Sequence, residues 1–200
     1  MRKIGILGGT FNPIHFAHIN LALKAYEEYE LDEVLFIPSG ISYMKKDMDI
    51  LDAKTRCELV SLAINDYPFF KLDTIEVDRA GNSYTFETLL KLKEREDAAY
   101  YYIVGADTLF MIEKWKEPKQ VFDLSVLLVA VRDEYDKKAV LEKIAELENK
   151  YNARISIIHG MNALDISSTK IRDALKRGKS IDEYVPKKEG QYILERGLFQ

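Results

Sequence analysis

Residues 8–18 read Gly-Gly-Thr-Phe-Asn-Pro-Ile-His-Phe-Ala-His. They follow the apolar run 4–7, which is typical of a buried strand, and they precede apolar residues at helical spacing. We therefore predict a strand-to-helix turn. Two adjacent glycines let the backbone approach a ligand closely, and a helix start presents unpaired N–H groups and the positive end of its dipole. Such a turn favours a bound anion.

Two of the three histidines of the chain, His15 and His18, fall in this turn. On a helix, residues three apart share a face, so both imidazoles can donate to one phosphate. For either histidine alone, an incidental place in a tight turn is the simpler interpretation, but the pair beside two glycines favours a phosphate cradle. The stretch is neither a dinucleotide fingerprint with three spaced glycines nor a P-loop with a Gly-Lys-Ser/Thr ending.

Composition sets the broad class. Two hundred residues predict one domain, 1–200, and 47% hydrophobic with 31% charged residues is ordinary for a globular protein. The net charge of −4 argues against a nucleic-acid partner, whereas a phosphorylated small molecule needs only a local basic pocket. The single cysteine, Cys57, and the lack of a signal peptide or a long apolar run predict a cytoplasmic protein without a membrane partner.

Strand-like and helix-like segments alternate along the chain, which predicts an α/β fold with a doubly wound, mostly parallel sheet and right-handed crossovers. Helices are expected between the strands, with N-caps at Ser83 or Thr85 and at 167–169, and a last helix at 186–197. Residues 41–52 are interpreted as an ordered loop or a lid. Strands are expected at 4–7, 34–37, 69–77, 100–104, 126–131 and 155–158.

In such sheets ligands lie beyond the carboxyl ends of the strands. We therefore expect several stretches to gather at one edge and form the site. They are the turn 8–18, residues 38–40, residues 105–107, Arg132 and the stretch after His159.

A second constellation, residues 166–172, reads Ile-Ser-Ser-Thr-Lys-Ile-Arg. Three hydroxyls at a helix start can bond phosphate oxygens, and Arg172, about one turn on, adds a charge-assisted fork for a polyphosphate. Taken alone, the stretch also suits a plain helix cap with a solvated arginine.

Together the two stretches resemble the G-x-F-x-P-x-H-x-G-H and S-S-T-x-x-R signatures of the nucleotidylyltransferase superfamily, with Ala17 where the family has glycine. The resemblance implies a Rossmann-like fold and transfer of a nucleoside monophosphate from a nucleoside triphosphate. It also implies an ATP-binding set. That set is Gly8, Gly9, Thr10, Phe11, Gly105, Asp107, Ser167, Ser168, Thr169 and Arg172.

Within the superfamily the chain is most similar to the nicotinate mononucleotide adenylyltransferases, nearly end to end. Lys45 and Arg56 match a lysine and an arginine of that family, with residues 42–44 replacing its Pro-Pro-His. Residues 83–85 match its S-Y-T, 105–107 its G-x-D, and 114–115 its K-W. A lone tryptophan is more often a core residue than a ligand platform. The resemblance implies mononucleotide binding by Thr85, Trp115 and Arg132.

The implied reaction joins ATP and nicotinate mononucleotide to give deamido-NAD and pyrophosphate, in NAD biosynthesis, by direct in-line transfer. His18 and His15, with Lys45, would be catalytic, and Mg²⁺ would bind with ATP without a protein metal site. The partners would be small molecules, and the oligomeric state stays open. A sister transferase for nicotinamide mononucleotide or phosphopantetheine and a degenerate nucleotide-binding domain are the alternatives; Thr85 and Trp115 favour the first reading over the sister enzymes.

Overall fold

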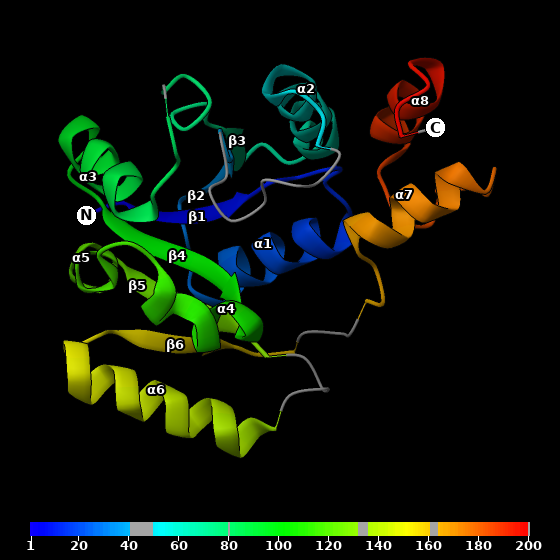
Figure 1. Cartoon of the computed structure of the whole chain (residues 1–200). Helices are drawn as coiled ribbons and strands as arrows, with labels where there is room; N and C mark the ends of the chain where they lie inside the picture. Colours follow the sequence, from blue (N-terminus) through cyan, green and yellow to red (C-terminus); the bar gives the residue numbers. More distant parts are fainter. Residues whose placement is uncertain (41–49, 80, 132–135, 161–163, 200) are drawn as a thin grey trace. The chain divides into compact units, whose positions relative to one another are not determined.

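The structure is a computed structural model that describes residues 1–40, 50–79, 81–131, 136–160 and 164–199 (Figure 1). Six strands form one sheet in the order β3-β2-β1-β4-β5-β6. The strands are β1 Lys3–Gly9, β2 Glu33–Pro38, β3 Phe70–Leu72, β4 Ala99–Gly105, β5 Val126–Ala130 and β6 Ile155–Ile158. In the described ranges the helices are α1 Phe16–Glu28, α2 Ala53–Ile64, α3 Thr85–Arg95, α4 Ala106–Met111, the 3-10 helix η1 Ile112–Lys114, α5 Pro118–Leu124, α6 Lys137–Tyr151, α7 Ser168–Lys176 and α8 Lys187–Glu195.

The sheet has the strand order of a doubly wound fold. From β1 the order runs outward through β2 and β3 in one direction and through β4, β5 and β6 in the other. The pairs β1–β4, β4–β5 and β5–β6 are all parallel. The predicted α/β fold with a doubly wound, mostly parallel sheet is confirmed.

Contacts group the chain into two compact units. The first unit holds residues 1–7, 21–35 and 83–163, and the second holds residues 8–20, 36–82 and 164–200. The chain passes from one unit to the other inside β1, α1 and β2, so neither unit is a continuous segment. A single domain over 1–200 stays a prediction.

The first unit is built on long apolar strands. Leu127, Leu128 and Val129 of β5 are buried, as expected for a parallel strand that is covered on both faces. At Gly5 in β1 a Cβ atom would lie 2.8 Å from Leu31 Cδ1 and 3.0 Å from Val34 Cγ2, so a larger residue would require these side chains to move.

The second unit is organised by α2, which packs against α8 and β3. Asp52 caps α2, because its Oδ1 accepts the backbone N–H of Thr55 over 3.0 Å. The helix is also held to α8 by the hydroxyl of Tyr192, which donates to the Glu58 carboxylate. The helix therefore has a fixed position relative to the loops at its N-terminus.

Two local predictions are wrong. The strand expected at 69–77 is confined to β3, because Asp73 accepts the backbone N–H of Ile75 over 3.0 Å and the Thr74 hydroxyl donates to Asp78 over 2.6 Å, which turns the chain. Neither Ser83 nor Thr85 caps α3: the N-cap is Tyr84 and makes no side-chain cap bond. The predicted cap at 167–169 is confirmed at Ser167, and most of the predicted loop 41–52 lies outside the described residues.

Candidate functional site

The histidine pair lies at the N-terminus of α1, in the second unit. The carbonyl of His15, one residue before the helix, accepts the backbone N–H groups of His18 over 2.9 Å and of Ile19 over 3.3 Å. The two imidazole rings stack with their centroids 3.7 Å apart. His15 is buried at 5% exposure, and His18 is half-buried. The predicted shared face is confirmed, and both rings stand at the positive end of the helix dipole.

Phe11 packs against the His18 ring of this pair. Its backbone has a φ of 50°, its side chain is 2% exposed, and its ring contacts His18 edge-on with centroids 5.2 Å apart. A Cβ atom at Gly9 would lie 3.1 Å from the Phe11 ring. The side chain of Phe11 thus belongs to the core, and only its backbone is available for the ATP-binding role that the sequence predicts.

Arg56 holds the glycine-rich turn in place. Its buried guanidinium, 2% exposed, donates to the carbonyl oxygens of Ser39 over 2.6 Å, Thr10 over 2.7 Å and Leu51 over 3.0 Å. Burial lowers the pKa of this guanidinium, and hydrogen bonds to three carbonyls compensate for the lost hydration. Arg56, which matches an arginine of the resembled family, therefore acts as a clamp: it connects the glycine-rich turn, the end of β2 and the start of α2 through hydrogen bonds.

The second signature is docked on the first, within the second unit. The Ser168 hydroxyl donates to the carbonyl of Pro13 over 2.8 Å. The Arg172 guanidinium donates to the carbonyl of Asn12 over 2.9 Å and to the Thr169 hydroxyl over 3.2 Å. The start of α7, with its hydroxyls and its arginine, is therefore fixed beside the turn that carries the histidines.

In the first unit, Gly105 and Asp107 lie at the carboxyl end of β4. A Cβ atom at Gly105 would lie 2.5 Å from Oδ1 of Asp107, so only glycine leaves this exposed carboxylate in its place. Asp107 also lies in the first turn of α4. The predicted G-x-D element thus presents one carboxylate at the carboxyl edge of the sheet.

An aromatic cluster lies where α3 begins, in the first unit. The hydroxyls of Thr85 and Tyr102 are 3.5 Å apart, and the half-buried Trp115 meets the Tyr102 ring edge-on with centroids 5.9 Å apart. The ammonium of Lys116 lies 4.6 Å from the centroid of the Tyr84 ring. Thr85 and Trp115, which the resemblance assigns to the mononucleotide, both lie against Tyr102. Sequence reasoning missed Tyr102, which lies inside a predicted strand, and Lys116, which directly follows Trp115.

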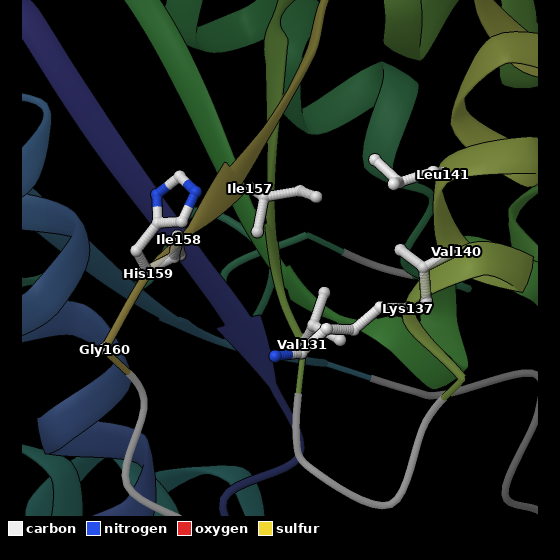
Figure 2. Close-up of a pocket in the computed structure, with 8 residues that line it drawn as sticks. All are labelled: Val131, Lys137, Val140, Leu141, Ile157, Ile158, His159 and Gly160. Carbon is white, nitrogen blue, oxygen red and sulfur yellow. The ribbon is translucent and has the colours of Figure 1, made fainter.

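A cavity of about 490 Å³ lies at the carboxyl ends of β5 and β6 (Figure 2). Apolar side chains and one lysine form most of its wall; they are Val131, Val140, Leu141, Ile157, Ile158 and Lys137. At its rim the backbone N–H of His159 donates to Glu28 over 2.8 Å, and its Nδ1 lies 2.5 Å from the same carboxylate. The β4–β5 and β5–β6 registers place Gly105, Ala130 and Ile158 at the same edge, as the sequence predicted for this unit.

Two predicted residues, Lys45 and Arg132, lie outside the described residues. In the part of the chain that the structure describes, no group of three or more His, Cys, Asp or Glu side chains is placed to hold a metal ion. No helix within these ranges is long and apolar enough to cross a membrane.

Comparison with known proteins places these features in a family. The cytidylyltransferase-like family matches residues 6–174. A probable nicotinate-nucleotide adenylyltransferase of Lachnoclostridium phytofermentans is 40% identical over 200 residues, covering 100% of both chains. One of Clostridium beijerinckii is 38% identical over 205 residues with the same coverage. The fold matches the structure of Plasmodium falciparum nicotinic acid mononucleotide adenylyltransferase complexed with NaAD, with a TM-score of 0.80, 20% identity, and coverage of 100% of this chain and 98% of that one.

Proposed function

The chain belongs to the nicotinate-nucleotide adenylyltransferases of the cytidylyltransferase-like family, and from this premise we propose that it joins ATP and nicotinate mononucleotide into deamido-NAD and pyrophosphate, in NAD biosynthesis. One observation of the structure carries the proposal. The start of α7 is bound to the turn of the histidine pair through Ser168 and Arg172, so phosphate donors of both signatures belong to one rigid group.

The reaction is a direct in-line transfer. A 5′-phosphate oxygen of the mononucleotide attacks the α-phosphorus of ATP, the bond from that phosphorus to the bridging oxygen breaks, and pyrophosphate leaves. Negative charge builds on the equatorial and bridging oxygens in the transition state. The attacking phosphate is already ionised, so no general base is required. His18 and His15, preorganised by stacking and by the helix end, donate to these oxygens, and Lys45 adds positive charge.

The triphosphate would be held by the second signature. Arg172 donates one hydrogen bond to the turn and one to Thr169, and its remaining N–H groups can donate to phosphate oxygens. The glycines of residues 8–9 allow the backbone to approach the nucleotide closely, and the Asp107 carboxylate can accept hydrogen bonds from ribose hydroxyls.

The nicotinate mononucleotide would bind at the aromatic cluster of the first unit. The indole of Trp115 offers an apolar platform for the pyridine ring, and the N–H groups at the start of α3 beside Thr85 suit its carboxylate. Arg132 is a further proposed contact.

Mg²⁺ is proposed to arrive with ATP. This ion prefers phosphate oxygens, water and one or two carboxylates to an all-protein cage, so the triphosphate itself can supply most of its ligands. When bound, it supplies charge neutralisation on the triphosphate.

We also propose that the enzyme works in the cytoplasm on small molecules alone. Its net charge of −4 disfavours nucleic acid, whose binding needs a broad basic surface, and its one cysteine, Cys57, is buried and free.

The test is pyrophosphate release from ATP and Mg²⁺ with nicotinate mononucleotide, run beside nicotinamide mononucleotide and phosphopantetheine. We expect turnover with nicotinate mononucleotide and strong preference over the other two. Preference for phosphopantetheine or the amide would assign the chain to a sister activity. Binding of ATP without turnover of any acceptor would make it a nucleotide-binding domain and overturn the proposal.

A further inference from the structure

Resting on the proposed function, we propose that Lys116 determines the preference for the acid over the amide mononucleotide. Its ammonium would pair with the carboxylate of the pyridine ring. Lys116 lies outside both sequence signatures.

The position of Lys116 follows from the chain around it. The 3-10 helix η1 ends where the backbone N–H of Trp115 donates to the carbonyl of Ile112 over 3.0 Å. The next residue, Lys116, extends its ammonium over the ring of Tyr84, 4.6 Å from the centroid. Tyr84 is the N-cap of α3. The loop that carries the tryptophan is therefore held against the helix start that carries Thr85.

Three kinds of recognition group meet at this place. Trp115 and Tyr102 supply aromatic surface, Thr85 supplies a hydroxyl and a helix N-terminus, and Lys116 supplies a full positive charge. An aromatic ring that bears a carboxylate matches all three. A ring that bears an amide matches only the first two.

The charge of Lys116 is available for a ligand. Two other lysines of the first unit form ion pairs with acids: Lys119 with Asp123, and Lys143 with Glu113. Within the described part of the chain, Lys116 has no ion pair with a carboxylate, and its side chain is exposed. A cation held only on an aromatic face can turn to an incoming anion at little cost.

The helix N-terminus alone gives a weaker preference for the acid. Glu87 lies in the first turn of α3, and its negative charge offsets part of the positive helix end. The backbone N–H groups there can donate to an amide oxygen as well as to a carboxylate. Discrimination by charge therefore requires a cation, and in the first unit Lys116 holds its ammonium against Tyr84, the N-cap residue of this helix.

The experiment compares Lys116→Met and Lys116→Arg with the wild type, using kcat/KM for nicotinate and nicotinamide mononucleotides at saturating ATP. We expect Lys116→Met to lower kcat/KM for the acid about tenfold, equal to about 1.4 kcal/mol, mainly through KM. Its kcat/KM for the amide should stay within about twofold, and Lys116→Arg should retain most of the preference. Lys119→Met, which removes a cation already paired with Asp123, is the matched control and should leave kcat/KM unchanged for both mononucleotides.

An equal loss on both mononucleotides would mean that Lys116 only supports Tyr84, and no loss would mean that it does not meet the carboxylate; either result overturns the inference. If the wild type turns over neither mononucleotide, the proposed function fails instead. The role of Lys116 is then decided by the ratio of the Kd values for the two mononucleotides in wild type and Lys116→Met. An unchanged ratio would overturn it as well.

Discussion

Nη1 of Arg172 donates to the backbone carbonyl of Asn12 over 2.9 Å, so the arginine of the second signature is bound to the turn that forms the first signature. The pair links positions 160 residues apart in the chain. An arginine with this bond has its guanidinium plane fixed, and the donors that remain are preorganised for a polyphosphate.

We predict that Arg172→Ala raises KM for ATP by about tenfold or more, because it removes a charge-assisted contact and frees the turn. Arg172→Lys should recover little of this loss, since an ammonium cannot make both bonds of the fork. Initial-rate kinetics with varied ATP measure both effects. Lys176→Ala, at the end of the same helix, is the control for loss of charge. An ATP KM unchanged in Arg172→Ala would contradict the assignment.

His18→Ala should lower kcat by about a hundredfold or more, the effect of losing one preorganised donor to a developing oxyanion. His18 is half-buried, and its ring leans on Phe11 and stacks on His15, so the variant should also lose some stability. Single-turnover rates at saturating substrates isolate the chemical step, and thermal unfolding reports the stability loss separately. Near-normal turnover would remove His18 from the catalytic residues.

Arg56→Met should lower the free energy of unfolding by about 3 kcal/mol, because three carbonyl acceptors lose their donor at a buried position. The glycine-rich turn should become less ordered at the same time, which would weaken ATP binding. Urea unfolding of the apo and ATP-bound protein measures both. Lys54→Met, on the exposed side of α2, is the matched control. A loss below about 1 kcal/mol would show that the clamp is not structural.

Much of this architecture follows from local patterns. The run 126–130 is apolar throughout, and Ser167 is a typical N-cap, so both were predictable. The prediction of a strand over 69–77 is too long, because the apolar residues of this stretch suit a strand throughout. The hydrogen bonds of Asp73 and Asp78 that turn the chain depend on side-chain geometry, which the pattern does not contain.

The candidate site was predictable only as far as its motifs reach. Arg56 finds its acceptor at Thr10, 46 residues away, and sequence alone does not reveal which buried carbonyls need a donor. Tyr102 and Lys116 belong to the aromatic cluster because β4 and the loop after η1 converge on the start of α3. Such convergence is a property of tertiary packing.

Glu113 links η1 to α6 and should make the protein sensitive to acid. Hydrogen bonds from Lys143, Lys150 and Tyr151 lower the pKa of its carboxyl to about 2. Because this folded-state pKa is below the ordinary value of 4.5, the stabilisation is present above that value and is lost as the pH falls through about 2. Glu113→Gln should therefore lower Tm at neutral pH and show a weaker loss of stability on acidification. Identical acid titrations of Tm in both proteins would contradict this role.

Glu189 should lower the stability of the protein as the pH rises, whereas Glu113 lowers it as the pH falls. It lies in the first turn of α8 with 0% exposure, and neither carboxylate oxygen has a hydrogen-bond partner among the described residues. Burial raises its pKa well above the ordinary value of 4.5, so its contribution to stability is complete below that value and is lost as the pH rises through the folded-state pKa. Glu189→Gln, which stays neutral, should match the wild type at about pH 4 and exceed it in Tm at about pH 8, by a free-energy difference that grows at most about 1.4 kcal/mol per pH unit. Glu183→Gln, at an exposed carboxylate, is the control. Thermal unfolding across this range decides the matter, since parallel pH profiles for wild type and Glu189→Gln would show that the buried carboxyl does not titrate with folding.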